Sequence, residues 1–396
     1  MQKILRLFLL LALAAAPAFA REIGDIVVTA DFKTIPIRVS ANTPELNDLA
    51  LRAFKVHGLY RLTASGYTYD IKFSQLTGTQ VRVDIAKGGS GTPVSSDVAN
   101  GRDASDALLH AADIAVVKTN GMGLKGFFTS KLAFIGGGGG KREIYTSDLF
   151  FRRVTQVTHD NALALFPRFS PDGSKLLYTS FFKSGFPDIF QIDLNTYQRT
   201  SFVSFKGTNG GARYSPSGGQ VAMVLSGEGN PEIYISNAQG RSVSRKTHSN
   251  SGKASPCWSP DGSRLVFTMD PGPQLYVMSS GGGTPTRLVT GYGYAAEPDW
   301  SKADPSKIAC TVKSGSYQIA VYDFAKGSAT IVPNKSAPFD GIEPSWLPDG
   351  RHVVYTARDR SSSQLCILDT VTGKSTHISP SSFGPAMQAN VWTPGL

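Results

Sequence analysis

A short element with an aromatic residue at its centre recurs along this 396-residue chain. Two of its copies read Arg168-Phe169-Ser170-Pro171 and Cys257-Trp258-Ser259-Pro260. The aromatic residues stand at positions 169, 214, 258, 300, 346 and 392, at intervals of 42 to 46 residues, and include all four Trp of the chain. A fixed period of this length is typical of repeat folds, in which each unit buries its apolar surface against its neighbours.

Most of the aromatic elements are followed by a tight turn and then by two apolar runs. The turns include Asp172-Gly173 and Asp261-Gly262, and the runs include 265–267 and 275–278. A polar run containing Thr closes most units, as at 285–289. Four short strands in ~45 residues are typical of one blade of a β-propeller. The 41 Gly and 23 Pro of the chain agree with many tight turns.

The number of copies predicts how the propeller closes. Leu132–Ile135 and Ile144–Tyr145 form a further pair of middle strands with no aromatic element before them, whereas little follows the element around Trp392. The tail can therefore supply the missing inner strand of the first blade, which leaves no free sheet edge. We predict an all-β, six-bladed propeller over residues 127–396, closed by a C-terminal strand at 389–394.

A small α/β domain is predicted ahead of the propeller, over residues 21–126. Thr43-Pro44-Glu45 offers a cap, a proline and an acid at the start of a helix that runs to Val56. Alternating residues predict strands at 71–74 and 79–86, and a second helix begins at Asp103 or Ser105.

Residues 1–20 have the pattern of a secretory signal peptide. Lys3 and Arg6 precede an apolar run, and Ala18-Phe19-Ala20 offers small residues for cleavage. We expect export to the periplasm, with a mature chain that starts at Arg21. The net charge of +10 could indicate nucleic acid binding, but export argues against it, and we expect no nucleic acid partner.

The cysteines and histidines give no sign of a cofactor or metal site. Cys257, Cys310 and Cys366 each lie in an apolar run, which favours three buried thiols, although an oxidising compartment leaves one disulfide open. The six His are scattered without the spacing of metal ligands.

Motifs for catalysis are also missing. Gly121–Gly126 matches the spacing of a dinucleotide-binding loop, but a predicted helix precedes it and a strand follows, which is the reverse of what that site needs. No nucleophile elbow and no zinc-protease motif occur. We therefore expect no catalytic, cofactor or metal residues, and a function carried by the surfaces of the propeller.

Candidate partner-binding residues come just before the inner aromatic elements, where the inner strands enter the central channel. Tyr and Gly at such places suit a protein or peptide partner. Three acids, Glu297, Asp299 and Glu343, could instead hold a cation, but solvation or pairing with Lys and Arg is the simpler interpretation. The candidate partner-binding residues are Thr208, Asn209, Gly211, Ala254, Ser255, Tyr292, Tyr294, Glu297, Asp340 and Glu343.

The sequence resembles the TolB family of the Tol–Pal system of Gram-negative bacteria. The resemblance is carried by Trp258-Ser259-Pro260-Asp261-Gly262 and its copies, by the ending Trp392-Thr393-Pro394, and by the junctions at 118–121 and 125–134. Segments 26–28 and 35–39 resemble the opening strands of the family. The resemblance covers essentially the whole mature chain.

This resemblance implies a non-enzymatic periplasmic adaptor. It implies that the propeller mouth binds the lipoprotein Pal, that the N-terminal segment binds TolA, and that the complex supports outer-membrane integrity and constriction at cell division. Further outer-membrane proteins are additional candidate partners, and we expect a monomer. The alternative is an exported propeller enzyme such as a carbohydrate lyase; that enzyme would need histidines at the inner-strand entrances, where this sequence has none.

Overall fold

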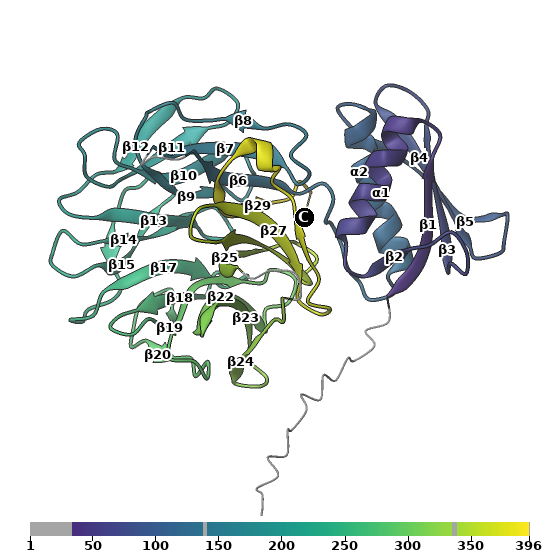
Figure 1. Ribbon diagram of the computed structural model, residues 1–396. Helices are drawn as coiled ribbons and strands as arrows, with labels where there is room; N and C mark the ends of the chain where they lie inside the picture. Colours follow the sequence, from purple (N-terminus) through teal and green to yellow (C-terminus); the bar gives the residue numbers. More distant parts are fainter. Residues whose placement is uncertain (1–33, 138–140, 335–338, 396) are drawn as a thin grey trace, which may run out of the picture. The chain divides into compact units, whose positions relative to one another are not determined.

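The computed structural model describes residues 34–137, 141–334 and 339–395, which belong to one compact unit. The predicted signal peptide and the segment 26–28 lie outside the described residues. The described chain begins with an α/β segment and continues into a β-propeller (Figure 1). The predicted fold class, a small α/β part followed by a six-bladed propeller, is thus confirmed.

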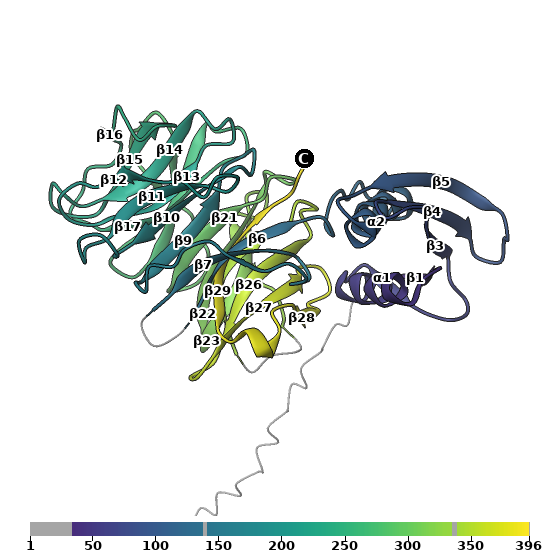
Figure 2. The ribbon, with the colours of Figure 1, turned by 90° about the horizontal axis from the view of Figure 1, so that it is seen from above.

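The α/β segment is a five-stranded sheet in the order β2-β1-β3-β4-β5 with two helices on one face (Figures 1 and 2). Helix α1 begins as predicted, because the Thr43 hydroxyl accepts a hydrogen bond from the Leu46 N–H, and Asp103 caps α2 through the Asp106 N–H. Alternate residues of the strands, such as Ile71 and Phe73, are buried under the helices. The elements are β1 (Ile35–Ala41), α1 (Pro44–Val56), β2 (Tyr60–Leu62), β3 (Tyr69–Gln75), β4 (Gln80–Lys87), β5 (Pro93–Asn100) and α2 (Ala104–Thr119).

Six four-stranded antiparallel sheets follow one another around the propeller in Figure 1. Blade 1 contains β6 (Lys131–Gly136), β7 (Glu143–Asp148) and β8 (Thr155–Gln156), and is completed by β29 (Ala386–Trp392). Blade 2 is β9 (Ala164–Phe169), β10 (Lys175–Ser180), β11 (Asp188–Asp193) and β12 (Arg199–Val203). Blade 3 is β13 (Asn209–Tyr214), β14 (Gln220–Leu225), β15 (Glu232–Asn237) and β16 (Ser244–Arg245).

The remaining blades have the same order of strands. Blade 4 is β17 (Lys253–Trp258), β18 (Arg264–Met269), β19 (Gln274–Ser279) and β20 (Thr286–Arg287). Blade 5 is β21 (Ala295–Trp300), β22 (Lys307–Ser314), β23 (Ser316–Asp323) and β24 (Ser328–Ile331). Blade 6 is β25 (Asp340–Trp346), β26 (His352–Arg358), β27 (Ser363–Asp369) and β28 (Ser375–His377); the 3₁₀ helix η1 (Ser381–Phe383) leads from it into β29.

The last strand, β29, closes the ring by pairing antiparallel with β6. It begins three residues before the segment 389–394 that the sequence suggested. The register of β29 differs from the one that the repeat predicts. In blade 2 the repeated aromatic Phe169 pairs with Leu176, but in blade 1 the residue that pairs with the equivalent Leu132 is Val391. Trp392 therefore lies one residue beyond the position of the other repeated aromatics. Its ring packs against Gly173, where a Cβ atom would lie only 2.3 Å from the indole.

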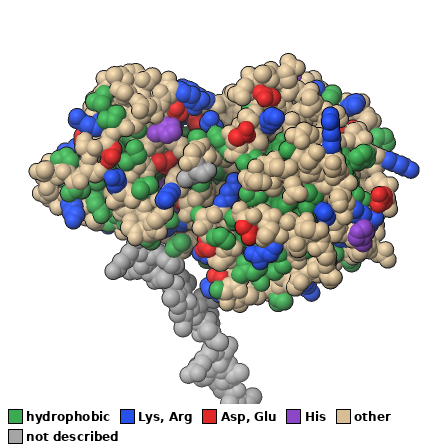
Figure 3. All heavy atoms as spheres, turned by 180° about the vertical axis from the view of Figure 1, so that it is seen from behind, with side chains coloured by type: hydrophobic (Ala, Val, Ile, Leu, Met, Phe, Trp, Pro, Cys, Tyr) green, Lys and Arg blue, Asp and Glu red, His purple; other side chains and the backbone are tan. Residues whose placement is uncertain are grey.

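The three cysteines are buried free thiols, as predicted. Basic residues are spread singly over the face shown in Figure 3 and do not gather in one patch. Among the described residues, no helix is both long and apolar enough to span a membrane.

Candidate functional site

The inner strands β9, β13, β17, β21, β25 and β29 each contact the next and surround the channel. In each blade the start of the inner strand lies beside the end of the second strand, as Ala164 lies opposite Ser180. We call this end of the propeller the mouth. The loops between the second and third strands and the loops leading into the inner strands lie at the same end, so the mouth is built mainly from loops.

Every inner strand carries a β-bulge at the same place. Its pairing with the second strand shifts register, and the residue three before the repeated position has a positive φ of 52–62°. A bulge turns one side chain out of the regular alternation and re-aims it. We call these six residues the bulge ring; they are Phe166, Gly211, Ser255, Glu297, Glu343 and Gln388.

Hydrogen bonds join the bulge ring from blade to blade. The Glu297 carboxylate accepts from the Thr311 hydroxyl at 2.6 Å and from the Glu343 N–H at 3.0 Å. The Glu343 carboxylate in turn accepts from the Thr356 hydroxyl and from the Gln388 amide, each at 2.8 Å. The Gln388 amide oxygen accepts from the N–H of Phe166 at 3.0 Å, so a polar chain runs through four neighbouring blades.

Burial and a neighbouring carboxylate change the pKa of one member of the bulge ring, Glu343. Burial of Glu343, together with the negative charge of Glu297, raises the pKa of the Glu343 carboxyl from 4.5 to about 7. Two carboxylates that share a desolvated site resist simultaneous ionisation. At neutral pH Glu343 is therefore close to its titration midpoint.

A second layer lies two residues further along the inner strands. Arg213 donates to Asp299 and to the Cys257 sulfur, both at 2.7 Å. Asp299 also accepts the N–H of Trp346 at 2.8 Å. Burial, with the nearby Arg213 charge, lowers the pKa of Arg168 to about 10. Asp299 is thus paired with Arg213, and the structure does not bring it into one carboxylate cluster with Glu297 and Glu343.

The sequence-predicted residues fall into two groups. Some are accessible at the mouth: Thr208 and Ala254 are exposed, and Ser255, Tyr292, Tyr294, Glu297 and Glu343 are half-buried. Others hold loops. Asn209 is fully buried and its side chain bonds the main chain of Phe205 and Pro187, Gly211 supplies a bulge, and Asp340 accepts the N–H of Tyr317 at 3.0 Å.

Sequence reasoning missed two residues beside Tyr294. The ring of Tyr317 meets Tyr294 edge to face at 5.3 Å, and the Arg358 guanidinium lies 5.9 Å from the Tyr317 ring centre. Both belong to middle strands, for which the repeat pattern predicted only apolar runs. A sequence signal for the bulge ring did exist: Pro167, Pro256, Pro298 and Pro344 follow bulge residues, and within a sheet proline is confined to edges and bulges.

A second cluster of titratable groups lies outside the channel, where the α/β segment meets blade 6. The side chains of His57, Asp349 and His352 are fully buried within 4.8 Å of one another. His352 donates from Nδ1 to Asp349 at 2.6 Å and accepts the Gly58 N–H at Nε2 at 3.1 Å. His57 accepts the Leu59 N–H at Nδ1. Its Nε2 has no hydrogen-bond partner among the described residues and lies 4.0 Å from the Asp349 carboxylate.

This buried trio does not fit a metal ion. Metal-binding His needs a free lone pair on one ring nitrogen. His352 has a proton or a donor on each nitrogen, and the Leu59 bond leaves the His57 proton on Nε2. Burial and the neighbouring His352 hold the pKa of His57 well below its usual 6.5, so this ring stays neutral. The trio is a hydrogen-bonded joint between the α/β segment and blade 6.

The geometry places the protein in the class of six-bladed β-propellers, with a candidate site formed by the loops of the mouth above a polar channel. The sequence matches the family described as TolB beta propeller domain over residues 121–396. The chain therefore belongs to the TolB propeller family.

Individual relatives agree with this assignment. A protein TolB homolog of Chlorobium luteolum is 32% identical over 197 residues, which cover 48% of this chain and 44% of that relative. A Tol-Pal system protein TolB of Desulfosudis oleivorans is 36% identical over 127 residues, or 32% and 28% of the two chains. The matches span less than half the length of these curated relatives.

A solved structure shows the same fold. The crystal structure of TolB from Acinetobacter baumannii superposes with a TM-score of 0.78 at 23% identity, covering 91% of this chain and 96% of that chain. The likeness extends over the α/β segment as well as the propeller.

Proposed function

We propose that this chain is a non-enzymatic, periplasmic adaptor of a Tol–Pal envelope complex. Its mouth binds the lipoprotein Pal, and residues 21–32 bind TolA. Through these contacts it supports outer-membrane integrity and constriction at division. Support comes from the TolB propeller match over 121–396 and from relatives whose names include the Tol–Pal system.

The observation that carries the Pal part of the proposal is the cluster around Tyr294 at the mouth. Tyr294 and Tyr317 expose part of their rings beside the Arg358 guanidinium. Tyr and Arg dominate binding energy at protein interfaces. We propose that these three residues join Thr208, Ala254, Ser255, Tyr292, Glu297 and Glu343 on the Pal surface, while Asn209, Gly211 and Asp340 fix its loops.

A pull-down with two partners tests this assignment. The purified chain, with residues 21–32 present or deleted, is mixed with Pal and TolA of the same organism. Deletion should leave Pal retention unchanged and weaken TolA retention. Equal loss of both partners would contradict separate sites, and no retention of Pal by the intact chain would contradict the adaptor function.

The enzyme alternative lacks support from the described channel. The bulge ring and the layer behind it contain acids, arginines and a thiol but no histidine.

We also propose that the chain folds as two units, with the boundary between residues 126 and 127 that the sequence predicts. Limited proteolysis that releases both parts intact would support that division, and cleavage only within one part would oppose it.

A further inference from the structure

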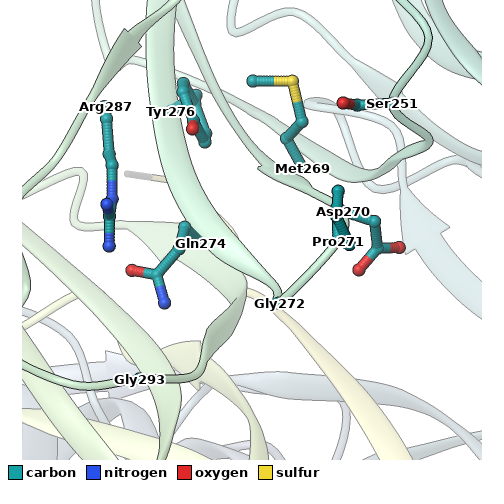
Figure 4. Close-up of a pocket in the computed structure, with 9 residues that line it drawn as sticks. All are labelled: Ser251, Met269, Asp270, Pro271, Gly272, Gln274, Tyr276, Arg287 and Gly293. Carbon is teal, nitrogen blue, oxygen red and sulfur yellow. The ribbon is translucent and has the colours of Figure 1, made fainter.

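A cavity of about 330 Å³ opens at the mouth beside the loop that carries Tyr292 and Tyr294. Figure 4 shows the residues that line it. Gln274 and Arg287 come from β19 and β20 of blade 4, and Gly293 comes from the loop that leads to β21. Met269 and Tyr276 supply apolar surface. We call this space the Gln274 cavity.

Gln274 has an amide oxygen without a partner. Its side chain is 7% exposed, and Oε1 is buried with no hydrogen bond from the described residues. The orientation of the amide is fixed, because Nε2 donates to the Tyr292 carbonyl at 3.2 Å and a flipped amide would oppose two oxygens. A buried acceptor with no donor is unfavourable, so this oxygen favours an incoming N–H or O–H group.

Arg287 adds a complementary donor. Its side chain is exposed and forms no hydrogen bond or ion pair with the described residues, while its main chain pairs with Tyr276 in the sheet. In Figure 4 its side chain and that of Gln274 extend in the same direction. Asp270 also lines the cavity. The Gln274 cavity therefore offers one acceptor and one cationic donor on the same side.

This pair of groups discriminates among ligand chemistries. A carboxylate would suit Arg287 but would face the Gln274 oxygen with a second acceptor. An ammonium group would suit Gln274 and the Asp270 carboxylate, which also lines the cavity, but would be repelled by Arg287. A carboxamide presents an N–H donor and a C=O acceptor side by side, and therefore satisfies both.

We propose that the Gln274 cavity binds the carboxamide side chain of an Asn or Gln in a peptide segment of the mouth partner. The amide N–H donates to Gln274 Oε1, the amide oxygen accepts from Arg287, and the methylene groups lie against Met269 and Tyr276. This proposal rests on the proposed function for the identity of the peptide, but the cavity chemistry can be tested without any partner protein.

The test uses small capped amino acids on the purified chain. Saturation-transfer NMR measures binding of N-acetyl-glutamine methylamide and of its glutamate, lysine and methionine counterparts. We expect the glutamine probe to bind at least fivefold more tightly than the other three. Equal binding of all four probes, tighter binding of a charged probe, or no binding of the glutamine probe would overturn the proposal.

Variants locate the binding. Gln274→Met and Arg287→Met should each weaken the glutamine probe at least fivefold, whereas the charge-matched control Arg241→Met, at an exposed turn away from the mouth, should not. If Gln274→Met fails to fold, probe binding by the Arg287→Met variant, at an exposed position, is the deciding measurement. Unchanged probe binding in Arg287→Met would overturn the proposal. Pal retention by a chain that binds no probe would reject this subsite and leave the adaptor function standing.

Discussion

The main-chain N–H of Glu343 lies 3.0 Å from the Glu297 carboxylate oxygen, so the backbone of blade 6 fixes the acid of blade 5. The same carboxylate oxygen accepts the Thr311 hydroxyl. Glu297 thus accepts two hydrogen bonds, and the neighbouring Glu343 carboxyl has a raised pKa. The bulge ring combines a left-handed backbone position in each blade with a Glu343 carboxyl of raised pKa.

The raised Glu343 pKa predicts a dependence of stability on pH. Between pH 4.5 and about 7 the folded state holds a proton that the unfolded state has lost, so the free energy of unfolding falls as pH rises through this window. Glu343→Gln should remove this dependence and stabilise the protein at pH 8 by up to about 3 kcal/mol. Urea unfolding between pH 4.5 and 8 measures the free energy of unfolding of both proteins, with Glu45→Gln, a substitution of an exposed glutamate, as the control. Parallel profiles for wild type and Glu343→Gln would contradict the raised pKa of Glu343.

His57 predicts an opposite dependence. Its folded-state pKa lies well below 6.5, so below pH 6.5 the unfolded state binds a proton that the folded state does not. The free energy of unfolding should therefore fall as the pH drops below 6.5. His57→Leu should be less stable at pH 8 by about 1–2 kcal/mol, through loss of the Leu59 bond, yet lose less stability on acidification. Exposed His248→Leu is the control, and equal acid sensitivity of His57→Leu and wild type would refute this role.

Asn209 was predicted to bind a partner, but its buried amide joins two loops. Asn209→Ala should lower the free energy of unfolding by about 2 kcal/mol, because several main-chain groups lose their partner. Exposed Thr208→Ala should leave stability within about 0.5 kcal/mol of wild type. Thermal unfolding compares the two variants. A stable Asn209→Ala protein with impaired Pal binding would restore the direct-contact interpretation.

Closure of the ring by β29 predicts a global effect of truncation. Deleting 386–396 removes the inner strand of blade 1 and exposes the edge of β6. The melting temperature should fall by about 5–10 °C or more in one cooperative transition. Deleting only 395–396 is the matched control. An unchanged transition after the longer deletion would show that β29 does not hold the ring.

The repeat predicted much of this fold because the inner aromatics alternate with turns at a nearly constant spacing. The number of repeats predicted the number of blades. The start of α1 was predicted separately from Thr43-Pro44-Glu45, because a helix cap depends on residues close in sequence. The bulge ring was missed, although Pro167 and Pro298 mark it, because the repeat was interpreted as regular strands. Contacts such as Gly58 to His352 join residues far apart in sequence, and local patterns carry no information about such pairs.

Tyr317 and Arg358 show a further limit of the repeat. They lie on middle strands, which were predicted only as apolar runs, yet they complete the group around Tyr294 at the mouth. A residue near the mouth end of a middle strand is exposed at the mouth. The strand pairing within the blade shows which residues lie at that end, and the sequence repeat does not.

Isothermal titration of the organism's own Pal into the purified chain directly tests the proposed Pal site at the mouth. We predict saturable binding that Tyr294→Ala weakens at least tenfold. The control Tyr197→Ala, which changes an exposed tyrosine on a turn at the opposite end of blade 2, should leave the affinity unchanged. Undetectable binding at tens of micromolar, or equal affinity of the Tyr294→Ala and wild-type proteins, would contradict the proposed Pal site.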